Sequence, residues 1–333
     1  MSVRPAVITG VGSYVPERVL TNADLEEIVD TTDEWIVSHT GIKERRIASD
    51  DQATSDLALE ASLRALEDAG VEAEELGLIV CATVTPDHLF PATANIIQDR
   101  IGAENAAAFD LLSGCTGFVY GLYVARQFIA TGDRDAVLVI AAEKLTSITD
   151  WTDRSTCVLF GDGAGAAVVQ PGEGDPAEVG LIAFELQSHG EHGGLLDVPA
   201  GGSRQPLDQE LLAAHENCLH MNGPELFKLA VRGIPEVAGK TIAKAGITNR
   251  DIDWVVMHQA NMRIIDAAAR RLDIPNERMV VNVDRYGNTS GASMAIALDE
   301  VYRDGHLQPG DNVLMVGFGA GFSLGGAVVR WSE

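Results

Sequence analysis

Three residues of this chain have the chemistry to transfer an acyl group together: Cys115, His258 and Asn288. A thiolate is a strong nucleophile toward a thioester or another acyl carbon. A histidine can donate a hydrogen bond or a proton, and an asparagine amide donates without adding charge. With backbone N–H groups, these two donors can stabilise a developing oxyanion by roughly 3–4 kcal/mol each. The set therefore predicts covalent catalysis at an acyl carbon.

Cys115 directly precedes residues 116–130, an apolar stretch that is typical of a buried helix. A cysteine at the first turn of a helix faces unpaired N–H groups and the positive end of the helix dipole, so we expect a lowered thiol pKa. The small residues Ser113, Gly114 and Gly117 leave room for a substrate beside the sulfur. Buried free cysteines are often inert, however, and Cys115 taken alone does not decide between a nucleophile and a core residue.

An internal repeat relates the regions that carry these residues. Residues 69–81 resemble residues 245–257, and residues 135–140 resemble residues 311–316, both at a separation of 176 positions. Each unit has the pattern of a helix that stops at Ala-Gly, a short loop and a buried strand. Two matches at one separation indicate a duplicated architecture.

Helices that alternate with buried strands predict an α/β fold, here with two halves related by a pseudo-twofold axis. We place the halves at residues 1–172 and 173–333, with the boundary in the loop 171–178. A third strand closes each half at a separation of 160, so an insertion is expected at residues 143–160. The other expected elements are helices 56–69, 225–245 and 262–272 and strands 78–82, 165–169, 254–257 and 326–329.

The repeat also predicts where the three chemical residues lie. The counterpart of Cys115 is Gly291, three residues after Asn288, and His258 ends the repeated strand of the second half. A single histidine there would more simply be a core or capping residue. Because equivalent strand–helix junctions converge in a duplicated α/β fold, we expect all three side chains to share one site.

Composition limits the other functions. The 333 residues carry 24 basic and 49 acidic side chains, a net charge of −25, which argues against binding to nucleic acid or an anionic membrane. No apolar run approaches the ~18 residues of a membrane span, and the N-terminus does not look like a secretory leader. The four cysteines, with no paired spacing, predict reduced thiols in a cytoplasmic protein: Cys81, Cys115, Cys157 and Cys218.

Histidine and glycine motifs give no sign of a metal or a dinucleotide. His189 and His192 lie in a glycine-rich excursion, residues 188–209, without further ligands at metal-binding spacing. The glycine runs 161–165 and 317–326 precede strands rather than helices, which is unlike a dinucleotide-binding loop. We therefore expect neither a metal site nor a cofactor.

The chain resembles β-ketoacyl-acyl carrier protein synthase III, a condensing enzyme of the thiolase superfamily, over nearly its full length. The motifs that carry the resemblance are Thr21-Asn-Ala-Asp-Leu25, Asp33-Glu-Trp-Ile36, Thr40-Gly-Ile42, Cys115-Thr-Gly-Phe118, Phe160-Gly-Asp-Gly-Ala-Gly-Ala166, His258-Gln-Ala-Asn261, Gly287-Asn-Thr-Ser290 and the run beginning at Gly317. The resemblance implies a five-layered αβαβα fold and a homodimer. It implies that Cys115 takes an acyl group from acyl-CoA and that His258 and Asn288 support decarboxylation of malonyl-acyl carrier protein, which initiates fatty-acid synthesis. CoA thioesters are then substrates, not cofactors.

The resemblance also implies roles for further residues. The backbone N–H groups of Cys115 and Ala320 match the oxyanion hole, and Phe318 matches the residue that shields the site. The other implied contacts are Trp35, Arg154 and Thr31 with CoA, Phe90 with the partner subunit's acyl pocket, and Lys228, Arg263 and Arg270 with acyl carrier protein. Two positions depart from some members of the family: His39 stands where some have an arginine near the CoA phosphates, and Pro224 replaces an asparagine that binds the pantetheine arm in some relatives.

Related functions fit less well. A degradative thiolase needs a second cysteine near the C-terminal glycine run, and elongating synthases have histidine where this chain has Asn288. A papain-like hydrolase would need a different sequence around Cys115. A non-catalytic paralogue would have no need of an intact triad. A polyketide-priming or hydroxymethylglutaryl-CoA-synthase-like enzyme is the alternative, and the sequence does not identify the preferred acyl-CoA primer.

Overall fold

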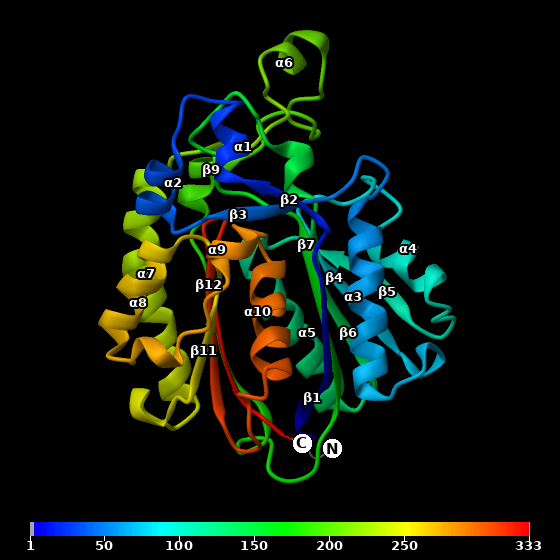
Figure 1. Cartoon of the computed structure of the whole chain (residues 1–333). Coiled ribbons are helices and arrows are strands. Elements are labelled where there is room, and N and C mark those ends of the chain that lie inside the picture. The colour runs from blue at the N-terminus through cyan, green and yellow to red at the C-terminus, as the bar shows by residue number, and fades with distance from the viewer. Residues whose placement is uncertain (1–2, 333) are drawn as a thin grey trace.

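Two main β-sheets organise residues 3–332, the part of the chain that the computed structural model describes (Figure 1). The first sheet has the order β1-β7-β6-β4-β5, and the second has the order β11-β12-β13-β8. The strand bounds are β1 Ala6–Tyr14, β4 Leu78–Ala82, β5 Ala107–Leu111, β6 Val137–Glu143, β7 Gly163–Pro171, β8 Gly180–Ser188, β11 Trp254–Met257, β12 Asn312–Gly319 and β13 Ser323–Arg330.

The pairing of these strands confirms the duplication. Leu78 on β4 pairs in parallel with Val137 on β6, and Trp254 and Val313, both 176 positions later, pair in the same way. Each sheet continues through two antiparallel pairs, β6-β7-β1 and β12-β13-β8. The outer pair of each sheet has a register shift, at Ile8/Gly10 and at Val328/Val329. Strand β5 has no counterpart in the second sheet and leaves the first with an additional edge strand.

Helices lie on both sides of each sheet and produce five layers, as predicted (Figure 1). Helices α5 and α10 form the central layer and contact both sheets. Helices α3 and α4 cover the outer face of the first sheet, at the right of Figure 1, and α7 and α8 cover the second sheet, at the left. Their bounds are α3 Thr54–Ala69, α4 Thr93–Arg100, α5 Gly117–Thr131, α7 Gly223–Lys244, α8 Met262–Leu272 and α10 Ala292–Arg303.

The amino-acid pattern explains this layering. Strand β4 is buried along its whole length, as expected for a strand with helices on both faces. Helix α3 instead has one apolar face, and its side chains pack with the outward-facing residues of the first sheet. It ends at Gly70, whose φ of +62° is the left-handed conformation that glycine adopts without strain. The predicted helix and strand bounds agree with the structure to within a few residues.

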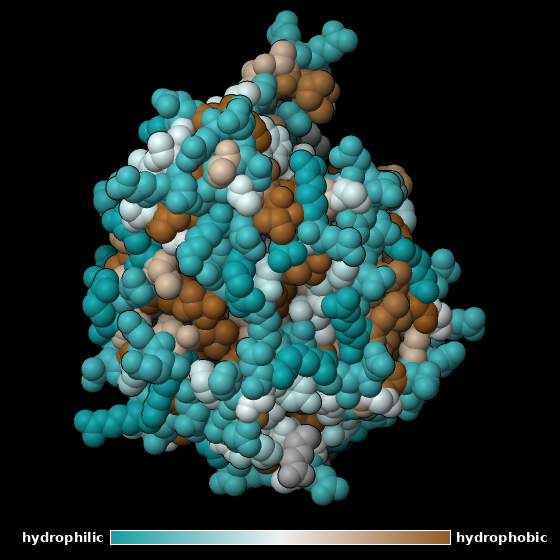
Figure 2. Space-filling view, viewed as in Figure 1, coloured by the Kyte–Doolittle hydropathy of each residue, from teal (hydrophilic) through white to brown (hydrophobic). Residues whose placement is uncertain are grey.

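Smaller elements gather around one end of the layered body, at the top of Figure 1. The predicted insertion is confirmed, because residues 144–162 join β6 to β7 whereas residues 320–322 join β12 to β13. The excursion with α6 stands out from the body in Figure 2 and exposes Leu207 and Leu212. These elements are β2 Arg18–Thr21, α1 Asn22–Glu26, α2 Asp33–Thr40, β3 Glu44–Ile47, β9 Leu196–Asp197, α6 Gln209–Ala213, β10 His220–Met221 and α9 Val283–Tyr286.

The structure bears on two further predictions, the lack of a membrane span and the reduced state of the cysteines. Within residues 3–332, no helix combines the length and apolarity needed to cross a membrane. All four cysteines are free thiols, and three of them are buried. The core therefore depends on apolar packing across the layers rather than on disulfide bonds.

Candidate active site

Cys115 lies in a single 3-10 turn, Gly114–Thr116, immediately before α5. The turn is close to the equivalent junction of the second half, since a Cβ added to Gly291 would lie 3.3 Å from the Gly114 carbonyl oxygen. The predicted convergence of the two strand–helix junctions is therefore confirmed.

The expected low pKa of Cys115 is wrong for this structure. Burial raises the pKa of the thiol to about 12, and hydrogen bonds from Ser290 and from the Cys115 backbone lower it by less. Nearby Glu143 adds a further unfavourable negative charge. Desolvation of a thiolate outweighs the benefit of a helix start when the sulfur is enclosed. The resting nucleophile is therefore a thiol, and its proton must be removed during the reaction.

His258 follows β11 directly, and its backbone N–H continues the ladder by donating to the Val316 carbonyl at 3.0 Å. Its Nδ1 lies 2.8 Å from the Ser293 hydroxyl, which leaves Nε2 for a substrate. Burial lowers the pKa of His258 to about 3, against a smaller opposite effect of a hydrogen bond to the Ser290 backbone. His258 is therefore neutral at physiological pH.

Asn288 follows α9 and is held by a backbone bridge to the segment that precedes β7. Its N–H donates to the Leu159 carbonyl at 2.8 Å, and its carbonyl accepts from the Gly161 N–H at 3.1 Å. The side-chain oxygen of Asn288 accepts from the Ser290 backbone N–H at 2.8 Å. Because that bond occupies the oxygen, the amide N–H groups are the part of the side chain available to a ligand.

The final glycine-rich hairpin packs against the nucleophile. A Cβ added to Gly319 would lie 2.5 Å from the Cys115 backbone nitrogen, so only glycine fits there. The Ala320 backbone nitrogen lies 3.0 Å from the Cβ position of Gly114, on the same side of the turn. Phe318 covers His258 edge-on, with ring centroids 5.4 Å apart. The residues predicted to form and shield an oxyanion hole are thus brought to Cys115.

Two cavities meet at Cys115. The first has a volume of about 110 Å³ and is lined by all three chemical residues, Cys115, His258 and Asn288, together with Phe318. The second, of about 120 Å³, contains Cys115, Ser290 and Ala320 on a largely apolar wall and has neither His258 nor Asn288 in its lining. One cavity therefore combines the nucleophile with two neutral polar groups, while the other offers apolar space behind the sulfur. This arrangement fits acyl transfer through a cysteine.

Known proteins share this sequence throughout. Residues 109–190 match the family model described as 3-Oxoacyl-[acyl-carrier-protein (ACP)] synthase III, and residues 242–331 match the model of its C-terminal part. The β-ketoacyl-[acyl-carrier-protein] synthase III of Caldanaerobacter subterraneus subsp. tengcongensis is 53% identical over 328 residues, 98% of either chain. The chain belongs to the β-ketoacyl-[acyl-carrier-protein] synthase III family.

Solved structures that are similar to this chain have the same fold. The synthase III of Thermus thermophilus is 46% identical with a TM-score of 0.90, and the match covers 98% of this chain and 99% of that one. The priming β-ketosynthase of the R1128 polyketide pathway has a TM-score of 0.92 at 37% identity, covering 100% and 98%. The thiolase-like fold is thus confirmed. The identities support a synthase III, an acyl-transferring condensing enzyme of fatty-acid biosynthesis, rather than the polyketide alternative.

The residues that the synthase III resemblance assigns to CoA line neither cavity at Cys115 and lie on α2, just before it, and in the insertion. The Arg154 guanidinium carbon is 4.8 Å from the centroid of the Trp35 ring, and its Nη1 donates to the Asp30 carbonyl at 2.7 Å. His39 stacks on Trp35 with ring centroids 4.5 Å apart. The hydroxyl of Thr31 is buried and has no hydrogen-bond partner within residues 3–332. A buried polar atom without a partner indicates a place for a ligand or water.

This group connects to the first cavity. Asn261, which lines that cavity, donates its amide to the His39 carbonyl at 3.0 Å. Helix α2 also contacts α8 where Gly41 meets Met262. Pro224, the second departure from the family, occupies the first turn of α7, where proline is readily accommodated.

Of the three cations assigned to acyl carrier protein, two share one hollow between α7 and α8. Arg263 and Arg270 line this hollow, which has a volume of about 400 Å³, together with Arg271. The guanidinium of Arg263 is 5.5 Å from the centroid of the Phe227 ring. Lys228 lies outside the lining and pairs with Glu225 at 2.7 Å. Phe227 also lines the first cavity, so the hollow and the cavity are neighbours.

Phe90 lines neither cavity at Cys115 of its own chain and is 85% exposed. Two other apolar side chains, Leu89 and Leu112, are similarly exposed at 87% and 79%. Leu112 follows β5, the edge strand of the first sheet.

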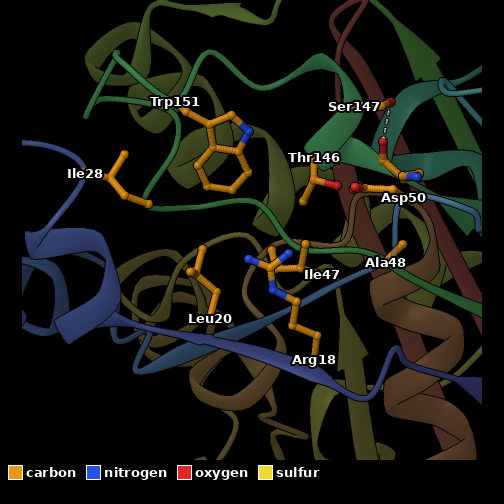
Figure 3. A pocket seen from close by; sticks show the side chains of 10 residues that line it. Arg18, Leu20, Ile28, Ile47, Ala48, Asp50, Thr146, Ser147 and Trp151 are labelled. Atoms are coloured by element: carbon orange, nitrogen blue, oxygen red, sulfur yellow. Dashed lines mark hydrogen bonds between the residues drawn. The ribbon is translucent and has the colours of Figure 1, made fainter.

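A further hollow, of about 410 Å³, lies outside this constellation, between the paired strands β2 and β3 and the insertion (Figure 3). Arg18, Asp50 and Trp151 project around it from different segments, together with apolar side chains that include Leu20 and Ile47. None of the predicted site residues lines this hollow, so it takes no part in the chemistry at Cys115.

Sequence reasoning missed several groups that shape the synthase III site. Ser293 orients His258, Ser290 lines the second cavity with Cys115, and the charge of Glu143 raises the pKa of the Cys115 thiol. The excursion 188–209 is more than a surface loop, because Leu196 and Val198 line the second cavity. For Ser290 and Ser293 the only signal was their place beside Asn288, whereas Glu143 stood at the end of an apolar strand, where an acid is unusual.

Proposed function

We propose that this synthase III condenses an acyl-CoA primer with malonyl-acyl carrier protein, with decarboxylation, through an acyl-Cys115 intermediate. The proposal rests on one observation: two different cavities meet at the Cys115 sulfur. The first contains His258 and Asn288, and the second is largely apolar. The first half-reaction needs a nucleophile and room for an acyl chain. The second needs neutral hydrogen-bond donors beside the same carbon.

In the first half-reaction, the Cys115 sulfur attacks the thioester carbon and CoA leaves. The backbone N–H groups of Cys115 and Ala320 receive the oxyanion, a role supported by their adjacency across Gly114 and Gly319. The acyl chain then extends into the second cavity, whose wall of aliphatic and aromatic side chains favours apolar groups. That wall consists of Val84, Leu145, Ile148, Phe160, Leu196, Val198 and Leu219 with neighbouring polar atoms.

In the second half-reaction, malonyl-acyl carrier protein enters the first cavity and loses CO2. Nε2 of His258 and the amide of Asn288 donate to the thioester oxygen and stabilise the enolate. Both donors are neutral, which suits an enclosed site because no charge has to be buried before the substrate arrives. The enolate carbon attacks the acyl-cysteine, the new carbon–carbon bond forms, and Cys115 is released.

The CoA donor is held, in this proposal, by Trp35, Arg154 and Thr31. The indole and guanidinium are a stacking pair that adenine can enter, and the partnerless Thr31 hydroxyl can bond to the nucleotide portion. His39 stacks on Trp35, and its Nδ1 lies 2.8 Å from the Trp35 carbonyl oxygen. We therefore assign the role of an adenine platform support, rather than a phosphate ligand, to His39.

Acyl carrier protein docks, in this proposal, at the hollow lined by Arg263 and Arg270, with Lys228 at its periphery. Acyl carrier protein is acidic, and this local basic surface stands out from a chain with a net charge of −25. Its position beside the first cavity lets a carrier-bound malonyl group reach Cys115.

We further propose a cytoplasmic homodimer that requires no cofactor. The exposed apolar side chains Leu89, Phe90 and Leu112 and the unpaired edge of β5 are features that a partner subunit would cover. In such a dimer Phe90 reaches the second cavity of the partner and helps to set the length of the primer.

Labelling with radioactive acetyl-CoA tests the central assignment. The wild-type protein should acquire one acyl group on Cys115, and Cys115→Ser should remain largely unlabelled. Peptide mapping identifies the labelled residue. Equal labelling of the two proteins would show that Cys115 is not the acylated residue. Separately, comparison of kcat/KM across acyl-CoA lengths would identify the primer that the wild-type protein prefers.

A further inference from the structure

Gln259, in the segment between β11 and α8, is completely buried and has an amide side chain that the mechanism above does not use. Its Nε2 donates to the carbonyl oxygens of Met257 at 2.9 Å and Val280 at 3.0 Å. Its Oε1 accepts from the backbone N–H groups of Asn282 at 3.0 Å and Val283 at 3.2 Å. Because a reversed amide would lose all four bonds, Gln259 has one orientation and connects the end of β11 to the start of α9.

The start of α9 depends on Gln259 for hydrogen bonds. The helix has only four residues, Val283–Tyr286, and is too short to be stable by itself. Its N-cap residue, Asn282, makes no side-chain cap, because its amide donates to Glu300 Oε2 at 2.8 Å instead. The Oε1 of Gln259 accepts from two N–H groups at this end, a role like that of an N-cap side chain. An oxygen from another segment therefore caps α9.

The far end of α9 determines where Asn288 lies. The Gly287 N–H donates to the Val283 carbonyl at 3.0 Å. Val283 is also a residue whose N–H Gln259 accepts, so two hydrogen bonds lead from Gln259 to the residue before Asn288. Gly287 has little room of its own, since a Cβ added there would lie 2.7 Å from the Leu159 carbonyl oxygen. A displacement at the start of α9 would therefore reach Asn288.

The backbone of Gln259 acts on His258. Its N–H donates to the Ser293 hydroxyl at 3.2 Å, and the same hydroxyl lies 2.8 Å from His258 Nδ1. Because the hydroxyl oxygen receives the Gln259 N–H, its own proton is available to Nδ1, which favours the tautomer with hydrogen on Nε2. That tautomer can donate to a thioester oxygen. Gln259 thus contacts the supports of both enolate donors, His258 and Asn288.

We propose that Gln259 is a positioning residue for condensation, which fixes the two enolate donors, His258 and Asn288, relative to each other. Its side chain holds α9, and its backbone holds the Ser293 hydroxyl. Gln259 lines neither cavity at Cys115, so it acts through other residues and touches no substrate. This inference rests on the condensation proposed above, which assigns the enolate donors.

Gln259→Met tests the proposal, because methionine has a similar shape but makes none of the four hydrogen bonds. The kcat for release of radioactive CO2 from malonyl-acyl carrier protein should fall at least about tenfold, since donors misplaced by about 1 Å lose much of their effect. KM and the acetyl labelling of Cys115 should stay within about twofold of wild type, because neither depends on the enolate donors. Gln98→Met, which removes a 2.7 Å hydrogen bond to the Ala103 carbonyl beside α4, is the matched control.

Gln259→Glu separates positioning from general damage to the fold. The new carboxyl can accept from both N–H groups of α9, but when ionised it repels the carbonyls of Met257 and Val280. When protonated, it donates to one of these carbonyls and regains three of the four bonds. The rate of CO2 release, divided by the wild-type rate at the same pH, should therefore rise at least about threefold from about pH 8.5 to about pH 6. Gln259→Met should show no such recovery.

The outcomes distinguish this proposal from the one on which it rests. Circular dichroism melts would establish that each variant is folded. A wild-type rate of CO2 release in folded Gln259→Met overturns the positioning role, as does an equal loss of acetyl labelling and CO2 release. Absence of CO2 release by the wild-type protein overturns the condensation mechanism itself. If Gln259→Met fails to fold, Gln259→Glu still decides the question, because a ratio that does not change with pH contradicts the proposal.

Discussion

The side-chain oxygen of Asn288 accepts a hydrogen bond from the Ser290 backbone N–H at 2.8 Å, and this single bond orients the amide of the site. With its oxygen engaged, Asn288 presents donors to the cavity that it shares with Cys115. The same bond also holds Ser290 in its left-handed conformation. One turn therefore positions Asn288 in the first cavity and Ser290 in the second.

Asn288→Ala should separate the two half-reactions. Acetyl labelling of Cys115 should persist, while malonyl decarboxylation should fall by about 100- to 1000-fold because one enolate donor is lost. Release of radioactive CO2 from malonyl-acyl carrier protein measures the effect. The neighbouring Thr289→Val is a matched control, because the buried Thr289 hydroxyl has no hydrogen-bond partner within residues 3–332. Unchanged decarboxylation in Asn288→Ala would show that the donor has been misassigned.

Gly319→Ala should distort the nucleophile turn. The new methyl group would lie 2.5 Å from the Cys115 backbone nitrogen, so the backbone must shift and the oxyanion hole opens. We expect a loss of acetyl transfer of at least tenfold, since donors misplaced by about 1 Å lose much of their effect. Gly239→Ala, on an exposed face of α7 with open space around it, should instead raise stability by about 0.5–1 kcal/mol. If Gly319→Ala and Gly239→Ala transferred the acetyl group at equal single-turnover rates, a methyl group at position 319 would not disturb the turn that holds Cys115.

His258 should make the protein sensitive to acid. Its pKa falls from the ordinary 6.5 to about 3 in the folded state, so the unfolded chain binds a proton first as the pH falls. The free energy of unfolding is therefore lost progressively below pH 6.5, by at most about 5 kcal/mol over the window to pH 3. Urea unfolding at pH 7 and pH 5 should show a smaller decrease for His258→Gln than for wild type. The exposed His88→Gln controls for histidine removal, and identical decreases in all three proteins would refute the prediction.

Trp35→Ala should weaken the use of acyl-CoA specifically. Removal of the indole eliminates the surface against which Arg154 stacks, and we expect KM for acetyl-CoA to rise about tenfold. The thioester of N-acetylcysteamine, which lacks adenine, is the matched substrate control. If KM rises by the same factor for both substrates, Trp35 supports the fold rather than binding of the nucleotide.

Arg263→Glu combined with Arg270→Glu should impair the carrier-protein substrate alone. Charge reversal in the hollow between α7 and α8 replaces attraction to an acidic protein by repulsion, and we expect KM for malonyl-acyl carrier protein to rise at least tenfold. Acetyl labelling from CoA should be unaffected. Arg250→Glu, an exposed cation on another segment, is the control. A uniform effect of both charge changes would indicate only a general dependence on net charge.

Local pattern and repetition made much of this protein predictable. The separation of 176 reappears as the β4–β6 and β11–β12 registers, because duplicated segments with the same continuous apolar runs pair in the same way. The helix stop at Gly70 follows from the freedom of glycine to adopt a positive φ. The triad followed from residue type and from its place at equivalent junctions.

The sequence by itself determined the layered fold, the family and the three chemical residues, since these depend on periodicity and short motifs. Only the tertiary structure decided the electrostatics. Segments that are distant in the chain bury Cys115, and this burial raises the pKa of its thiol. A helix start alone was expected to lower that pKa. The hydrogen bonds that Thr83 and Thr85 donate to the buried Glu143 likewise join positions far apart in the chain. No local pattern encodes them, because burial and proximity are properties of the packed layers.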